Sequence, residues 1–272
     1  MNQKIITLYL IILFFTTACV SKKHKEDTNE QNIPSQTQPR PQKAAPKYSD
    51  RNFFFLRGDV KEVILSYSYS DQLLNDQELE GMFENIKDMH ICFNKAGLIT
   101  RLYWEGTPYD YTLDEPDENG NFAASGDPKL GNEYYYYVPK LGTRENKEKE
   151  HVLTIQLDQF HNGEVVGSYN VMCNATLYSD GTIEKLYNNL FSELGPGTDG
   201  AGINDDYRYV DSPDNLPTRV LRGVLYGGDE FLFDYKILYP EKDEQGNWTK
   251  AIYSDTEKGS VELIITREIS YY

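Results

Sequence analysis

The sequence predicts an all-β protein: an antiparallel array of hairpins, folded as a curled sheet, a barrel or a sandwich, with at most one short helix. Three observations predict this class. Tyrosine is abundant, with 22 among 272 residues, and aromatic and β-branched residues fit the pleated, half-buried surface of a sheet. Several segments alternate apolar and polar residues with a period of two. Glycine-centred turns of one pattern separate strand-like segments.

Residues 1–18 have the order of a secretory signal peptide. Lys4 precedes an apolar run that is shorter than the roughly 20 residues a bilayer-spanning helix needs, and small residues follow it. Thr16-Thr17-Ala18-Cys19 resembles the signal of bacterial lipoproteins, in which the cysteine is lipidated and begins the mature chain. The resemblance implies anchoring at Cys19 by two or more acyl chains, which hold a protein stably on a membrane. An uncleaved anchor, or ordinary cleavage beside an incidental cysteine, is the alternative.

Residues 19–48 are rich in Gln, Pro, Lys and Ser and contain little that can be buried. Such a segment cannot offset the entropy cost of folding, so we expect a disordered tether. Its prolines favour an extended spacer. The lysines nearest the anchor either contact anionic lipid head groups or simply begin a solvated linker; they are Lys22, Lys23 and Lys25.

Residues 49–272 form the folded part, which suits one large β domain or two sub-domains. The chain carries a net charge of −16, and the tether is basic, so the folded part is more acidic than the whole. Such a surface repels a phosphate backbone, which excludes nucleic acid as a partner.

Strands are expected over 60–69, 152–157 and 261–269, because each segment contains period-two alternation. One helix is expected over 77–86, where Asp76 could cap an amphipathic segment. A hairpin is the alternative there.

Three segments share one plan of strand, tight turn and strand. They are FNKAGLITRLY (93–103), LYSDGTIEKLY (177–187) and KDEQGNWTKAIY (242–253), which align on Gly97, Gly181 and Gly246. Glycine supplies the positive φ that such a turn needs. The second, fourth and sixth residues after each glycine should share one face, because side chains alternate along a strand. Weaker copies occur at 117–122 and 161–165.

These segments resemble YD (RHS-like) repeats, in which Tyr-Asp-x-x-Gly-Asn-x connects one strand to the next. Residues 56–63 and 265–272 are similar to the start and end of a largely uncharacterised group of small bacterial lipoproteins built from such repeats. The resemblance implies an antiparallel hairpin array. It brings no catalytic residues, because the repeat pattern is structural.

Catalytic motifs are absent from the sequence. His90, His151 and His161 do not have metal-ligand spacing, and there is no nucleophile elbow, phosphate loop or dinucleotide-binding glycine pattern. We therefore interpret the protein as a non-enzyme. A glycosidase needs only two suitably spaced carboxylates, so this activity remains the open alternative.

Two groups of residues are candidates for ligand binding. Tyr134, Tyr135, Tyr136 and Tyr137 would place two rings on each face of a strand, and an exposed pair would suit stacking on a glycan or peptide. Cross-strand aromatic packing is the alternative. Asp199, Asp205 and Asp206 lie in a Gly/Asp-rich segment, 193–215, expected to be a loop that either binds calcium or is simply solvated. No other cofactor is expected.

Cys92 and Cys173 remain once Cys19 is lipidated. Outside the cytoplasm two cysteines can persist as a disulfide. The alternative is a pair of buried free thiols.

The sequence thus predicts a non-catalytic protein anchored through Cys19 in the cell envelope, at the outer membrane, with either membrane face open. Its role would be structural or in binding another envelope protein. The alternative function is a surface module that binds a glycan or peptide through the tyrosine run.

Overall fold

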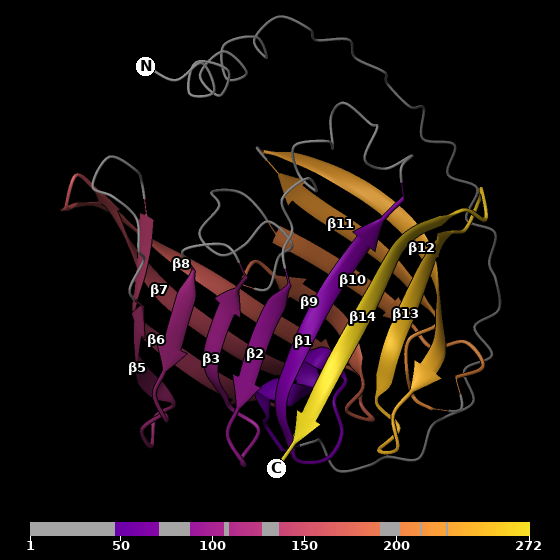
Figure 1. Ribbon diagram of the computed structural model, residues 1–272, viewed down its shortest axis with the longest axis horizontal. Coiled ribbons are helices and arrows are strands. Elements are labelled where there is room, and N and C mark those ends of the chain that lie inside the picture. The colour runs from indigo at the N-terminus through magenta and orange to yellow at the C-terminus, as the bar shows by residue number, and fades with distance from the viewer. Residues whose placement is uncertain are drawn as a thin grey trace, which may run out of the picture. The chain divides into compact units, whose positions relative to one another are not determined.

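The computed structural model describes residues 47–70, 88–105, 109–126, 136–190, 202–212, 214–226 and 228–272. In these residues fourteen antiparallel strands form one closed barrel, in which consecutive strands pair and the first strand pairs with the last (Figure 1). The all-β prediction is confirmed, and a barrel is the architecture adopted. The signal peptide with Cys19, the tether as far as residue 46 and the helix expected at 77–86 lie outside the described residues.

Long strands lie on two parts of the wall, at β6–β8 and around β12, β14 and β1, with shorter strands between them. Their bounds are β1 Val60–Tyr69, β2 Met89–Phe93, β3 Ile99–Trp104, β4 Asp110–Leu113, β5 Asn121–Gly126, β6 Tyr136–Lys147, β7 Glu150–His161, β8 Glu164–Leu177, β9 Ile183–Asn188, β10 Gly202–Arg208, β11 Arg219–Tyr226, β12 Asp229–Lys242, β13 Trp248–Asp255 and β14 Val261–Tyr271. Among the described residues before β1, Asp50–Phe54 form a 3-10 helix, η1. None of the helices in the described ranges has the length and hydropathy of a bilayer-spanning segment.

The repeated turns share one backbone geometry. In the turn that starts at Asn94, its N–H donates to the carbonyl four residues on, at 2.8 Å, and the Gly97 N–H donates to the Asn94 carbonyl at 2.9 Å. The same two bonds recur in the turns that start at Asp117, Tyr178 and Asp243. All four glycines have φ between 79° and 86°. Because each turn follows an even-numbered strand, all four lie at the same end of the barrel.

The predicted arrangement after these turns is wrong in one respect. Phe93 pairs with Ile99 but Cys92 pairs with Arg101, so Thr100 is an extra residue in a β-bulge. The bulge turns Ile99 inward and Arg101 outward, because each inserted residue reverses the alternation. Bulges at the equivalent position follow the second and third turns. The second and fourth residues after each of these glycines therefore lie on opposite faces of the wall, and not on one face as predicted.

The copy expected at 161–165 forms a different turn. Asn162 and Gly163 both have positive φ, at 51° and 79°, and connect β7 to β8 at the opposite end of the barrel. This is the dihedral pattern of a tight two-residue hairpin turn.

The inner face of the wall is mostly apolar, whereas the outer face carries many charged side chains together with exposed apolar ones such as Leu221, Leu232 and Leu238. In β7, Leu153, Ile155 and Leu157 are fully buried and point inward. Lysines and arginines of the outer face pair with carboxylates on neighbouring strands. These cross-strand pairs are Arg101–Asp110, Lys140–Asp158, Lys185–Asp206, Arg219–Asp234 and Lys250–Glu241.

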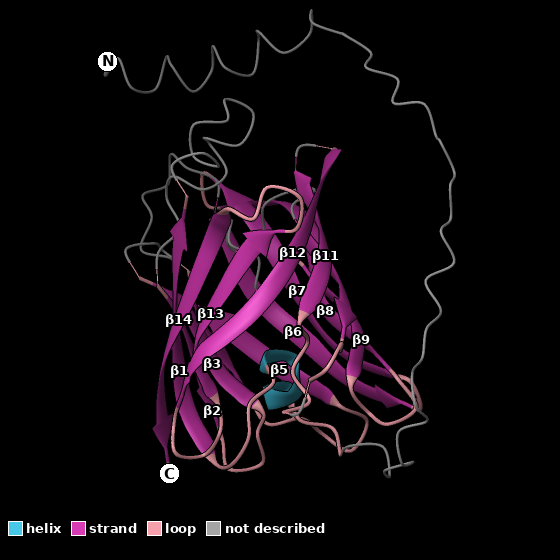
Figure 2. Ribbon diagram, turned by 90° about the vertical axis from the view of Figure 1, so that its right-hand side faces the viewer, coloured by secondary structure: helices cyan, strands magenta, loops and turns pink. Residues whose placement is uncertain are grey.

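The segment before β1 fills the end of the barrel where the repeated turns lie. Figure 2 shows η1 inside the ring of strands. Asp50 is fully buried, and its Oδ2 accepts hydrogen bonds from the Ile99 N–H at 2.7 Å and from Arg144 Nε at 2.9 Å. Arg51 donates to the carbonyls of Asn94 and Gly58. These bonds fix η1 to the wall.

Candidate functional site

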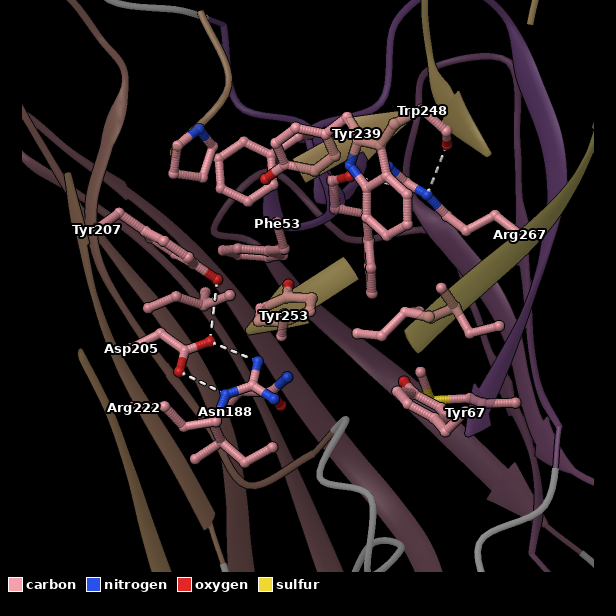
Figure 3. Close-up of a pocket in the computed structure, with 18 residues that line it drawn as sticks. Phe53, Tyr67, Asn188, Asp205, Tyr207, Arg222, Tyr239, Trp248, Tyr253 and Arg267 are labelled. Atoms are coloured by element: carbon pink, nitrogen blue, oxygen red, sulfur yellow. Dashed lines mark hydrogen bonds and ion pairs between the residues drawn. The ribbon is translucent and has the colours of Figure 1, made fainter. Parts of the chain in front are cut away.

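A cavity inside the barrel lies between residues 53–55 and the inner faces of several strands, chiefly β10 to β14 (Figure 3). Aromatic rings dominate its lining, among them Phe54, Tyr239, Trp248 and Tyr253. The space open to the centres of water molecules is about 90 Å³. One water needs roughly 10–15 Å³ on this measure, so the cavity holds several waters or a small organic molecule.

One side of the cavity carries a satisfied ion pair. Asp205 of β10 accepts from Arg222 of β11 through both carboxylate oxygens, at 2.8 and 2.9 Å, and its Oδ2 also accepts from the Tyr207 hydroxyl at 3.0 Å. Burial, followed by the Asp205 charge, raises the pKa of Tyr207 well above its usual value, so this hydroxyl stays a donor. Asp205 is therefore neutralised by its own neighbours.

The opposite side carries Arg267, which projects from β14 and is 4% exposed. Its Nε donates to the Trp248 carbonyl at 3.1 Å and its Nη1 to the Phe54 carbonyl at 2.7 Å. The guanidinium stacks over the Trp248 ring (Figure 3). These contacts orient the side chain without neutralising it.

Two buried donors beside this cavity lack an acceptor. Within the described part of the chain, Arg267 Nη2 and Trp248 Nε1 have no hydrogen-bond partner, and Arg267 forms no ion pair with a described carboxylate. Burial lowers the pKa of Arg267 to about 9, so the group is still cationic at neutral pH. A buried charge or N–H without a partner is costly, and these two unsatisfied atoms lie next to each other in one stack beside the cavity.

A second cavity, of about 170 Å³, lies beside η1 and includes His151 and Leu216 in its lining. His151 is 1% exposed, and its Nδ1 has no hydrogen-bond partner among the described residues. Burial lowers its pKa, which the Asp50 charge opposes only in part.

The buried thiol of Cys173 is a separate feature of the interior, and burial raises its pKa well above the usual value. A thiol needs its thiolate form to act as a nucleophile, so this environment does not activate Cys173.

The tyrosine run is only half described, because Tyr134 and Tyr135 lie outside the described residues. Tyr136 stacks on Phe160 of the neighbouring strand with ring centroids 5.2 Å apart. Tyr137 packs against the core, and its hydroxyl accepts from Gln159 at 3.0 Å. Both rings are partly buried by these contacts. Tyr136 and Tyr137 therefore match the alternative interpretation, cross-strand packing. They do not form an exposed pair of rings.

The expectation of a loop at 193–215, either solvated or calcium-binding, is wrong for two of its three candidate aspartates. Asp205 and Asp206 lie in β10, where consecutive side chains face opposite sides of the wall. Asp205 points inward to Arg222, and Asp206 points outward to Lys185. Asp199 lies outside the described residues. In the part of the chain that the structure describes, no three His, Cys, Asp or Glu side chains lie close enough to hold a metal.

The predicted disulfide is not formed. Cys92 and Cys173 are both free thiols, on β2 and β8, which are not neighbouring strands. Cys92 faces outward, where its thiol contacts Glu62, whereas Cys173 is fully buried inside. The wall of the barrel separates the two sulfurs.

Sequence reasoning missed Arg267, although its strand was predicted. Leu263, Ile265 and Arg267 alternate along β14, and all three are buried. A charged residue at an inward position of an alternating strand was the available signal. Its significance depends on Trp248, whose position next to it follows only from the barrel.

Comparison with known proteins finds no matching family model and no matching curated protein. A solved structure of a porin-like protein from Bacteroides vulgatus is similar, with a TM-score of 0.40 and 11% sequence identity. The similarity covers 78% of this chain and 98% of that chain.

Proposed function

We propose that the protein is a non-catalytic cell-envelope protein, anchored by lipid at Cys19, whose barrel stands in water beside a membrane and does not cross it as a pore. The observation that carries this proposal is the polarity of the wall. Its outer face holds cross-strand ion pairs and its inner face holds the apolar core.

A membrane-spanning barrel has the opposite polarity, with an apolar band outside and a polar interior. Arg219 and Asp234 pair on the outer face with side chains about half and one-third exposed. A single arginine or lysine on the lipid-facing surface costs about 2–4 kcal/mol at the middle of a bilayer. Five such pairs distributed around the wall favour an aqueous environment.

The interior also argues against a pore. The core is continuous from η1 through the inner faces of the strands, and includes Phe53, Leu153 and Ile237. The segment before β1 lies within the barrel, bonded to the wall through Asp50. A water-filled channel requires a polar lumen instead.

In this proposal the start of the chain, and not the barrel, attaches the protein to the membrane. The resemblance of residues 16–19 to a lipoprotein signal supplies an anchor, and residues 19–48 supply a spacer long enough to leave the barrel in water. The partner through Cys19 is the membrane itself. A further partner would be another envelope protein, with a glycan as the alternative.

The test compares the full-length protein with Cys19→Ser in a bacterial host that processes lipoproteins. We expect the unsubstituted protein in the membrane fraction, labelled by a fatty-acid probe. Cys19→Ser should lose the label, and a variant in which a cleavable secretory signal without a cysteine replaces residues 1–19 should be soluble without detergent, with its β-type circular dichroism unchanged. If the variant that lacks residues 1–19 resists carbonate extraction, the barrel itself is in the membrane and the aqueous barrel is contradicted. Cys92→Ser, which changes a cysteine of the wall, should behave as the unsubstituted protein.

A further inference from the structure

We propose that the cavity between η1 and β14 binds a small organic monoanion, a carboxylate with an apolar or aromatic body. The carboxylate would accept hydrogen bonds from Arg267 Nη2 and Trp248 Nε1. This inference does not depend on how the protein is anchored.

The charge of the ligand follows from the charges of the cavity. Asp205 is already matched by Arg222, to which it is bonded through both oxygens. Arg267 has no carboxylate partner among the described residues. One cation is thus left without a carboxylate in contact with it, and a bound monoanion would supply one.

The shape of the anionic group follows from the two donors. Arg267 is held in place by bonds to the Trp248 and Phe54 carbonyls, so Nη2 is fixed before any ligand arrives. The Trp248 indole belongs to the same stack. A carboxylate has two acceptor oxygens and can satisfy both donors, whereas a neutral amide brings one carbonyl oxygen and no charge.

The body of the ligand follows from the remaining lining. Phe54, Tyr67, Tyr239 and Tyr253 present rings to the cavity. Apolar walls with a few fixed polar groups are the usual composition of a small-molecule site. The volume of about 90 Å³ open to water centres suits a single-ring compound and excludes an oligosaccharide chain.

The experiment uses purified full-length protein in a non-ionic detergent, with Trp104→Phe so that Trp248 alone reports by fluorescence. Benzoate is titrated against benzamide, its uncharged analogue of the same shape, and against acetate and phosphate. We expect benzoate to change Trp248 emission and to bind about ten- to a hundredfold more tightly than benzamide, the factor that a charged hydrogen bond contributes. Equal binding of benzoate and benzamide, or no binding of either, would overturn the proposal. Preference for phosphate over both carboxylates would overturn the assignment of a monoanion.

Variants then locate the charge. Arg267→Met should reduce benzoate affinity about tenfold or more and leave benzamide binding unchanged, whereas Arg267→Lys should retain part of the preference for benzoate. Arg101→Met is the matched control, because Arg101 is an outer-face arginine paired with Asp110, and it should bind benzoate normally. Benzoate binding that survives Arg267→Met would refute the assignment. If Arg267→Met does not fold, the comparison of benzoate with benzamide in the parent protein still decides the matter.

Discussion

Two ion pairs, one inside the barrel and one outside, show how differently the two faces of the wall use charge. Asp50 and Arg144 meet at 2.9 Å with side chains 0% and 3% exposed. Lys185 and Asp206 meet at 3.3 Å on the outer face, with 51% and 24% exposed. Breaking the inner pair leaves a charge that water cannot reach, whereas the outer charges are solvated with or without each other. The inner pairs therefore fix the fold, and the outer pairs mainly keep the surface soluble.

The largest expected effect is that of Asp50→Ala. This change leaves Arg144 buried without its carboxylate and removes the acceptor of the Ile99 N–H. We expect a loss of about 3–5 kcal/mol in the free energy of unfolding, measured by urea denaturation. A loss below about 1 kcal/mol would show that the inner face tolerates unpaired charge as the outer face does.

Two glycines give the next contrast. Gly97 has φ of +86°, and a Cβ there would lie 2.2 Å from Ser49 Oγ, next to η1. Gly163 has φ of +79°, but a Cβ there would meet nothing within 4 Å. Gly163→Ala should lower the free energy of unfolding by about 1–2 kcal/mol, because alanine disfavours the left-handed backbone conformation. Gly97→Ala should lower it further, because Ser49 must also move. Equal losses in thermal unfolding would mean that η1 is not held tightly against this turn.

The pH dependence of stability tests the interior at His151. Burial lowers the pKa of this imidazole, so below about 6.5 the unfolded chain takes up a proton that the folded protein resists. Stability should therefore be fully retained above pH 6.5 and fall as the pH drops below that value, by about 1.4 kcal/mol per unit of pKa shift at most. His151→Gln should reduce this slope. Denaturation series at pH 5 to 8 that superimpose for both proteins would contradict the burial argument.

The smallest expected effect is that of Asp206→Ala, on the outer face. Solvent-exposed pairs contribute about 0–1 kcal/mol, and salt screens them further. We expect a change within that range at low salt and none at high salt. A loss near that of Asp50→Ala would erase the distinction between the two faces.

Local chemistry made part of this structure predictable. The turns at Gly97, Gly181 and Gly246 were expected from a glycine with positive φ, and the structure has them. The bulges after these turns are not predictable from the sequence, because the amino-acid composition does not show where an extra residue is inserted. Each inserted residue nevertheless moves every later side chain of the strand to the other face.

The site was less predictable than the fold because it depends on distant segments. Arg267 and Phe54 are far apart in sequence, and only barrel closure brings them together. The glycines and aspartates around Asp205 predict a loop, although tertiary pairing with Arg222 makes the segment a strand. Such pairing overrides local preference.

Closure through β1 and β14 has a consequence for how the chain reaches its final state. Val60 of β1 pairs with Tyr271 of β14. The barrel therefore closes, and its two free edges disappear, only after the last strand has formed. Bringing such distant segments together is slow, because the entropy of a long loop is lost before the pairing compensates for it. Until then both edges can recruit strands of other chains. We therefore expect slow closure of this seam to lower the yield of folded protein, and a chaperone that covers the two edges in that interval to raise it.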